Sequence, residues 1–316
     1  MRKEIVDDIR DQPTGEYRYG EAGAGPNAIT SAGGESYQYD AAGQMLRYNG
    51  YDLRFNPEGE LVEANNVSTG VRIVQHYDDA GERRLALVYR RGRPVQVHRF
   101  IAPDYSIRNG EEIWFAGTGA VRAEVVRSKG VEVDAFLLDQ ITNYVNGERA
   151  GPKPLPAEYM DLNGDGISLD VADLEAARAA FMSEGRVGGE KLVWRFSAVD
   201  HLGSTNQSTD SAGDLISSQR FRAYGKVASR TGQHGYRDGY LGKETEPDID
   251  LGLQRIGARY YASAIGRWVT PDQAIGQSPD MMMASPLESN LYSYSRNNPI
   301  MVRDPHGYNG EAEGGR

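Results

Sequence analysis

Oxygen-bearing side chains alternate along one short acidic stretch of the sequence. Asp161, Asn163 and Asp165 occupy every second position, and Gly166 follows where such a loop bends sharply. Carboxylate and amide oxygens at this spacing are typical of the first half of a calcium-binding loop. The pattern therefore predicts a site for Ca²⁺.

The second half of this loop is irregular. Its twelfth position, which is acidic in a regular calcium loop, is Ala172, and Asp170 and Asp173 lie on either side of it. We expect one inserted residue and take Asp170 and Asp173 as the remaining candidate ligands. The alternative is an acidic turn in which Asp173 acts as the N-cap of the following helix.

Asp200 next to His201 forms a second pair of chemistry-bearing residues, and we interpret it as a turn. A general base needs a nucleophile beside it, but the sequence has no Cys and no Ser in a recognisable catalytic setting. A Gly-rich phosphate loop and a His-Glu-x-x-His helix are also missing from the sequence.

Aromatic residues concentrate near the end of the chain. Their faces could form a platform for sugars, but cross-strand packing in a sheet is the expected role. The residues concerned are Tyr260, Tyr261, Trp268, Tyr292 and Tyr294.

The calcium-loop pattern lies in a segment, residues 131–190, that differs from the rest of the chain. It contains a Pro-rich stretch at residues 151–156 and a helical pattern from Val171 to Glu184. Leu174, Ala177 and Phe181 are expected to form the buried face of that helix. We predict a small α-helical insertion here.

Short hairpins are predicted before the insertion. An aromatic residue, then Asp or Asn, two free positions and Gly, recur at residues 39–43, 55–59 and 77–81. The Asp or Asn side chain can bond the turning backbone, and Gly supplies the positive φ that begins the return strand. Single hairpins are barely stable in water, whereas stacked hairpins bury each other's faces. The sequence therefore predicts a mainly β, antiparallel hairpin-repeat sheet.

Composition and charge limit the function classes. The formal net charge of −10 disfavours binding to nucleic acid, and no apolar run is long enough for a membrane span. No signal peptide is recognisable at the start of the chain.

The hairpin signature resembles the YD repeat of Rhs proteins, and the later part of the chain resembles the Rhs repeat-associated core domain. The calcium-like loop is similar to those of EF-hand and dockerin repeats. The core resemblance rests on ordered motifs at residues 200–204, 224–225, 242–244, 252–253, 257–261, 266–272, 290–294, 297–299 and 304–307.

The resemblance implies four regions and a containment function. The regions are YD repeats at 1–130, the insertion at 131–190, the core domain at 191–308 and a flexible tail at 309–316. The expected protein is a shell or plug segment of a secreted bacterial toxin, starting partway through the repeats. It would enclose a C-terminal toxic cargo, with the remaining repeats and a secretion machinery as partners. The alternative is a calcium-dependent cell-surface module that binds a glycan or a protein.

The resemblance also implies self-cleavage by an aspartyl mechanism just beyond the core. Asp272 and Asp304 match the aspartates of the family's two Asp-Pro-x-Gly motifs, and Asp280 is a second candidate for the first of them. Gln273 replaces the first proline and Tyr308 replaces a leucine. The span between Asp272 and Asp304 is also lengthened by a Met-rich stretch around Met281. The structural alternative is that Asp304 simply closes a turn with Gly307.

Overall fold

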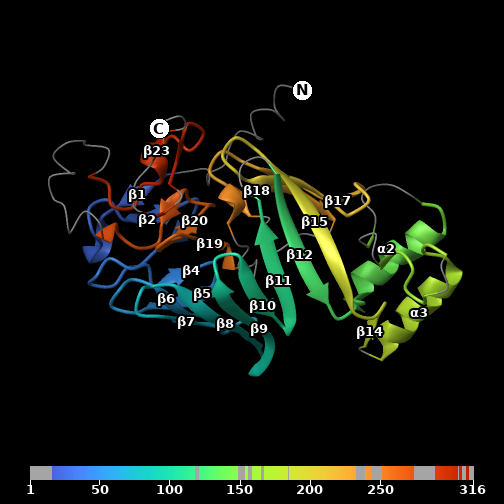
Figure 1. Cartoon of the computed structure of the whole chain (residues 1–316). Helices are drawn as coiled ribbons and strands as arrows, with labels where there is room; N and C mark the ends of the chain where they lie inside the picture. Colours follow the sequence, from blue (N-terminus) through green and yellow to red (C-terminus); the bar gives the residue numbers. More distant parts are fainter. Residues whose placement is uncertain are drawn as a thin grey trace. The chain divides into compact units, whose positions relative to one another are not determined.

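The computed structural model of the chain is mainly antiparallel β-sheet (Figure 1). The two α-helices among the described residues are α2 and α3, both within the predicted insertion. The chain divides into two compact units, with unit 1 formed by residues 1–97, 221–227 and 243–316 and unit 2 by residues 98–220 and 228–242. The structure describes residues 16–117, 121–148, 154–155, 159–164, 167–183, 185–232, 239–243, 251–273, 289–304, 306–307 and 311–312.

In unit 1, five strands pair antiparallel in chain order. They are β4 (Arg47–Tyr48), β5 (Tyr51–Phe55), β6 (Leu61–Asn66), β7 (Val71–Tyr77) and β8 (Arg83–Arg90). Smaller sheets are formed by β1 (Arg18–Tyr19), β2 (Ile29–Ala32) and β3 (Glu35–Ser36), by β19 (Leu253–Ile256), β20 (Arg259–Ala262) and β21 (Arg267–Trp268), and by β22 (Val302–Arg303) and β23 (Glu311–Ala312). The 3₁₀ turns η1 (Glu21–Gly23) and η5 (Ser295–Asn297) also belong to this unit.

Alternation along the strands of unit 1 produces one hydrophobic core. On β7, for example, Val71 and Ile73 are buried while Arg72 and His76 are exposed, because neighbouring side chains leave a strand on opposite faces. The core joins the repeat strands to the later strands, with Met45, Tyr51, Leu61, Ile73, Leu253, Tyr260 and Val269 among its members.

The predicted hairpin turns of the repeat are confirmed. In each, the side-chain Oδ1 of the Asp or Asn accepts the backbone N–H four positions on, at 2.8–2.9 Å. The backbone N–H of the Gly three positions on donates to the same residue's carbonyl at 3.0 Å. The glycines have φ of 77° to 80°, which a residue with a Cβ adopts only at a cost. The three pairs are Asp40 with Gly43, Asn56 with Gly59, and Asp78 with Gly81.

Unit 2 continues the antiparallel pairing. Its strands are hydrogen-bonded in the order β9 (Arg93–Ala102, from His98 onward), β10 (Tyr105–Arg108), β11 (Glu111–Ala116), β12 (Val121–Ser128), β15 (Lys191–Val199), β16 (Thr205–Thr209), β17 (Leu215–Phe221) and β18 (Val227–Gly232). The 3₁₀ turn η3 (Tyr240–Gly242) follows.

Asp200 and Asp210 repeat the turn chemistry of unit 1. The side chain of each accepts the backbone N–H four positions on, at 2.8 Å for Asp200 and 2.9 Å for Asp210.

The insertion lies between two strands that pair directly, because Ser128 at the end of β12 faces Lys191 at the start of β15. It contains β13 (Val131–Glu132), α2 (Ala135–Val145), α3 (Val171–Met182) and β14 (Arg186–Val187). These elements have a core of their own, with Leu137, Ile141, Leu155, Tyr159, Leu169, Leu174 and Ala177 among its members. The Tyr159 hydroxyl accepts from Gly130 N and donates to Gly189 O, so it ties the two ends of the insertion together.

The predicted face of the second helix was wrong at one position. Leu174 and Ala177 are buried as expected, but Phe181 is 37% exposed and Ala180 takes its place in the core. Spacings of three residues, from 174 to 177 to 180, keep the buried side chains on one stripe. No helix among the described residues has the length and apolar composition needed to cross a membrane.

Candidate functional site

Arg259 brings together the two aspartates that the sequence singled out. It is the first residue of β20, and its side chain is only 5% exposed. Its Nη2 lies 2.8 Å from Asp272 Oδ2 and 3.6 Å from Asp304 Oδ2. Both carboxylates are also buried, so one guanidinium offsets two charges that have little access to water.

The turn that contains Asp304 is bonded to the same arginine. Asp304 Oδ1 accepts the backbone N–H of Gly307 at 2.7 Å, and Arg259 Nε donates to the Gly307 carbonyl. The backbone of His306 lies so close to Gly257 that a Cβ there has no room. These contacts hold the Asp304 turn against the hairpin formed by β19 and β20.

The remaining contacts of the guanidinium fix its plane. Arg259 Nη1 donates to the Leu291 carbonyl at 3.2 Å, and Cζ lies 4.2 Å from the centre of the Trp268 ring. A cation held this way favours the charged form of both neighbouring carboxylates. Aspartyl hydrolysis, in contrast, needs one carboxyl in its protonated form.

Gln273, the departure from the first Asp-Pro motif, makes a contact of its own. Its Nε2 donates to the carbonyl of Glu58, in the second repeat turn, at 2.6 Å. The alternative aspartate Asp280 lies outside the described residues, as does Tyr308.

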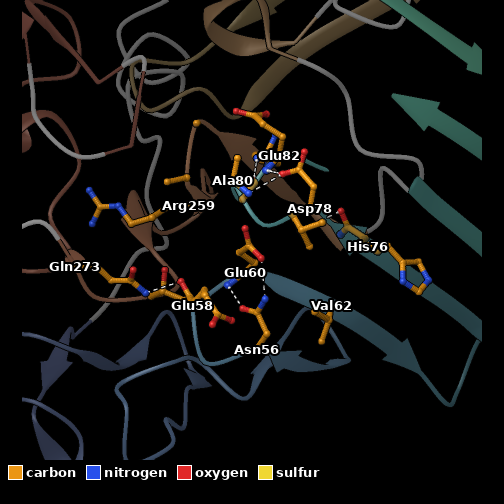
Figure 2. Close-up of a pocket in the computed structure, with 18 of the residues that line it drawn as sticks. Asn56, Glu58, Glu60, Val62, His76, Asp78, Ala80, Glu82, Arg259 and Gln273 are labelled. Carbon is orange, nitrogen blue, oxygen red and sulfur yellow. Dashed lines mark hydrogen bonds between the residues drawn. The ribbon is translucent and has the colours of Figure 1, made fainter. Parts of the chain in front are cut away.

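A cavity of about 880 Å³ lies beside Arg259 within unit 1. We call it the turn cavity, because the second and third repeat turns form much of its wall (Figure 2). Its lining includes residues 56, 58–60, 62, 75–82, 255, 257–259, 270–271, 273 and 306.

The described part of the calcium-like loop is held by hydrogen bonds to backbone. Asp170, and not Asp173, is the N-cap of α3, and the two residues form a capping box. Asp173 is fully buried, with Oδ1 accepting from Leu162 N and Asn163 N and Oδ2 from Asp170 N. Asp161 Oδ1 accepts from Gly164 N, while Asp165 lies outside the described residues.

The aromatic residues near the end of the chain pack in the interior, as expected. Tyr261, Trp268 and Tyr294 are each 0% exposed, with ring centres 4.3–5.7 Å apart. Tyr260 and Tyr292 are 2% and 3% exposed, which excludes these five residues as a platform for sugars.

Reasoning from the sequence missed two features. Arg259 was noticed only as part of a motif. It is nevertheless unusual, because this charged residue and the three residues that follow it in β20 are all buried. The turn at Asp210 was missed because Thr209, not an aromatic residue, precedes it; a search for Asp-x-x-Gly alone finds it.

Comparisons with known proteins agree with this architecture. The family model described as Teneurin YD-shell matches residues 193–300. Toxin subunit YenC1 of Yersinia entomophaga is 34% identical over 118 residues, which cover 36% of this chain and 11% of that protein. Human Teneurin-1 is 24% identical over 282 residues, which cover 86% of this chain and 8% of Teneurin-1.

The fold is also that of a solved shell. The crystal structure of TcdB2-TccC3-Cdc42 superposes with a TM-score of 0.56 at 20% identity, over 85% of this chain and 11% of that one. The chain thus has the fold of a YD-repeat shell segment, and it spans about a tenth of the length of these proteins.

Proposed function

We propose that this chain is a wall segment of a secreted bacterial toxin shell that encloses a polypeptide cargo. The proposal rests on one observation: within each unit, successive hairpins pair in chain order. A single hairpin is too small to be stable alone, and pairing joins the hairpins into a continuous wall. The likeness to toxin subunit YenC1 and to TcdB2-TccC3 supports it. Further repeats of a parent shell and a secretion machinery are the partners that this role requires.

Limited trypsin digestion of the full-length parent protein tests enclosure. The cargo segment should remain uncut at its Lys and Arg bonds within the parent and be cut rapidly when expressed alone. The control is a tag on the outside of the shell, which trypsin should remove at the same rate in both samples. Equal digestion of the cargo in the two samples would contradict enclosure.

Self-cleavage beyond Gly307 is a second candidate function, favoured by the convergence of Asp272 and Asp304 on one nitrogen. One carboxylate would take a proton from water, whose oxygen attacks the peptide carbonyl. The other, protonated carboxyl would donate to the leaving amide nitrogen as the C–N bond breaks. The guanidinium of Arg259 would have to shift for that carboxyl to hold a proton.

Intact-mass spectrometry of the purified chain tests this chemistry. Cleavage after Tyr308 would remove residues 309–316 from the wild type, while Asp304→Asn would keep its full mass. Glu175→Gln, an exposed change on α3, is the control and should be cleaved like the wild type. A wild-type chain that keeps its full mass would contradict self-cleavage.

We also propose that the loop from Asp161 to Asp173 binds Ca²⁺ weakly, on the spacing of its oxygen-bearing side chains. Calorimetric titration with millimolar calcium should give heat in the wild type and less in Asp161→Asn. That variant keeps an acceptor for the Gly164 N–H but loses a charge. Asp139→Asn on α2 is the matched control, and no heat in the wild type would exclude the site.

A further inference from the structure

Four two-residue hairpin turns in the described part of the chain share one backbone geometry. They are Gly33-Gly34, Asn49-Gly50, Arg91-Gly92 and Asn109-Gly110. Both residues of each turn have positive φ, with 47° to 58° at the first position and 79° to 89° at the second. These are the signs of φ of a type I′ turn, which strongly favours Asn-Gly or Gly-Gly. Arg91 is therefore the exception among the four.

Arg91 occupies this position at a cost in free energy. A side chain with a Cβ strains the left-handed conformation, whereas Asn can offset the strain with a local hydrogen bond. The neighbouring turn accommodates the arginine, because Arg91 N donates to the Gly70 carbonyl at 2.7 Å and a Cβ at Gly70 would lie 3.2 Å from Arg91 Cγ. Arg91 is nevertheless exposed, so packing does not explain why an arginine stands here. A residue held in a strained conformation without such an explanation indicates a functional role.

Arg91 belongs to a cluster of three arginines, Arg90, Arg91 and Arg93, that we call the basic tip. All three are exposed, and none forms an ion pair within the described part of the chain. Residues 66–71 and 89–95, which form this turn and the neighbouring one, contain no acidic residue. The basic tip is thus a local positive charge on a chain whose formal net charge is −10.

An exposed apolar side chain lies in the neighbouring turn. Val67 begins the turn from residue 67 to residue 70, between β6 and β7, and is 77% exposed. This turn contacts the basic tip through the hydrogen bond from Arg91 N to the Gly70 carbonyl. Cations without internal partners beside an exposed apolar side chain are typical of a peripheral membrane contact. In such a contact the cations reach lipid phosphates and the apolar group enters the headgroup region.

We propose that the basic tip binds the surface of a membrane that contains anionic phospholipids. Arg90, Arg91 and Arg93 donate to lipid phosphates, and Val67 enters the boundary between headgroups and acyl chains. The end of a hairpin reaches a flat surface without the rest of the chain, whereas a linear polyanion such as nucleic acid would also meet the acidic remainder. This binding does not depend on the wall function, because the tip lies within unit 1 of the isolated chain.

Co-sedimentation of the purified chain with vesicles tests the proposal. Vesicles of equimolar phosphatidylcholine and phosphatidylserine should bind the wild type, and vesicles of phosphatidylcholine alone should not. The triple variant Arg90→Gln/Arg91→Asn/Arg93→Gln should bind about 100-fold more weakly, since each arginine near an anionic surface contributes about fivefold.

The matched control for charge is the triple variant Arg99→Gln/Arg220→Gln/Arg303→Gln. It removes the same charge from exposed strand positions outside the basic tip and should bind like the wild type. Circular dichroism of every variant should show the β-sheet spectrum of the wild type.

Two single variants separate the apolar contribution from the charge. Val67→Ser should weaken vesicle binding about fivefold at low and at high salt, whereas added salt should weaken the contribution of the arginines. Arg91→Asn should also weaken binding about fivefold and yet raise the melting temperature by about 2 °C, because it restores a residue that the turn favours.

The proposal holds if the basic-tip triple variant and Val67→Ser both lose binding to the anionic vesicles. It is overturned if the two triple variants bind equally, if phosphatidylcholine vesicles bind as well as anionic ones, or if the wild type does not sediment with anionic vesicles. Unchanged binding of Val67→Ser, together with equal binding of the wild type to duplex DNA, would assign the tip to soluble polyanions and also overturn it. A lower melting temperature of Arg91→Asn would contradict the strain at Arg91 on which the proposal rests.

Discussion

Arg259 links several separate segments near the end of the chain. It connects β20 with Asp272, with the Asp304 turn and with the carbonyls of Leu291 and Gly307. Two buried carboxylates on one cation form a network in which each partner is costly to remove alone, because the rest stays buried without compensation.

We therefore predict that Arg259→Met lowers the free energy of unfolding by about 3–5 kcal/mol. Methionine keeps much of the packing against Trp268 but removes the guanidinium that Asp272 and Asp304 share. Urea denaturation followed by tryptophan fluorescence measures the loss. Arg303→Met, at an exposed position of β22, is the control and should change stability by about 0.5 kcal/mol or less. Equal effects of the two changes would refute the role assigned to Arg259.

Buried tyrosines make the stability of the protein sensitive to alkaline pH. Burial, with a smaller contribution from the charge of Asp40, raises the pKa of Tyr292 to about 12, and burial raises that of Tyr37 to about 12 as well. The unfolded chain releases these protons near pH 10, before the folded chain does, so stability should fall as the pH rises from about 10 to about 12.

Denaturation midpoints measured across this pH range check the prediction. Tyr292→Phe should flatten the fall, since one fewer proton is then released on unfolding, although it also loses the hydrogen bond to the Gly43 carbonyl. A Tyr292→Phe slope equal to that of the wild type would disprove the linkage.

The repeat turn restricts its glycine in two ways, through the backbone conformation and through packing. Gly81 has φ of +77°, and a Cβ at this position would lie 2.8 Å from Glu60 Oε1. Gly213 closes an equivalent turn in unit 2 with φ of +84°, but a Cβ there would meet no atom within 4 Å. The two glycines thus separate backbone strain from crowding.

Alanine substitution should show this separation. Gly213→Ala should cost about 1–2 kcal/mol of stability, from backbone strain alone. Gly81→Ala should cost about 0.5 kcal/mol more, because the flexible end of Glu60 must turn away and weaken its hydrogen bond with Asn56. Thermal or urea unfolding of both variants measures the costs. In a Glu60→Ala background the two glycine substitutions should lower the free energy of unfolding by the same amount. A difference that persists in this background would mean that Glu60 does not cause the additional cost at Gly81.

Local chemistry made the turns, the strands and the insertion predictable from the sequence. The side-chain bonds of Asp40, Asn56 and Asp78 that form the turns all go to backbone within four residues, so a short local pattern is enough to specify the turns. Only the family resemblance predicted that Asp272 and Asp304 lie close together. Their shared partner Arg259 could not be predicted, because the contacts depend on how distant strands pack and leave no periodic signal in the sequence.

Among the described residues, the hydrophobic core of unit 1 and that of the insertion have no residue in common. The core of unit 1 contains residues from β2 to β8 and from β19 onward, whereas the insertion's core takes only Val193 and, at its margin, Val126 from the strands that flank it. Strand pairing in unit 2 also passes directly from β12 to β15. The insertion is thus an addition to the sheet, and the sheet does not depend on it for pairing.

Removal of the insertion should therefore leave a folded β protein. Replacing residues 129–190 by Asn-Gly joins Ser128 to Lys191, which already face each other, through a two-residue turn suited to a hairpin. We expect circular dichroism to lose its helical component and keep its β component, with a moderate fall in stability because Val126 and Val193 lose apolar contacts. The matched control replaces residues 129–190 by a flexible Gly-Ser linker of the same length as the insertion. This control loses the contacts of the insertion without closing a tight turn, so the two effects can be distinguished. An unfolded Asn-Gly variant would mean that the helices are required for the sheet to form, since pairing between β12 and β15 would then be insufficient to hold the two strands together.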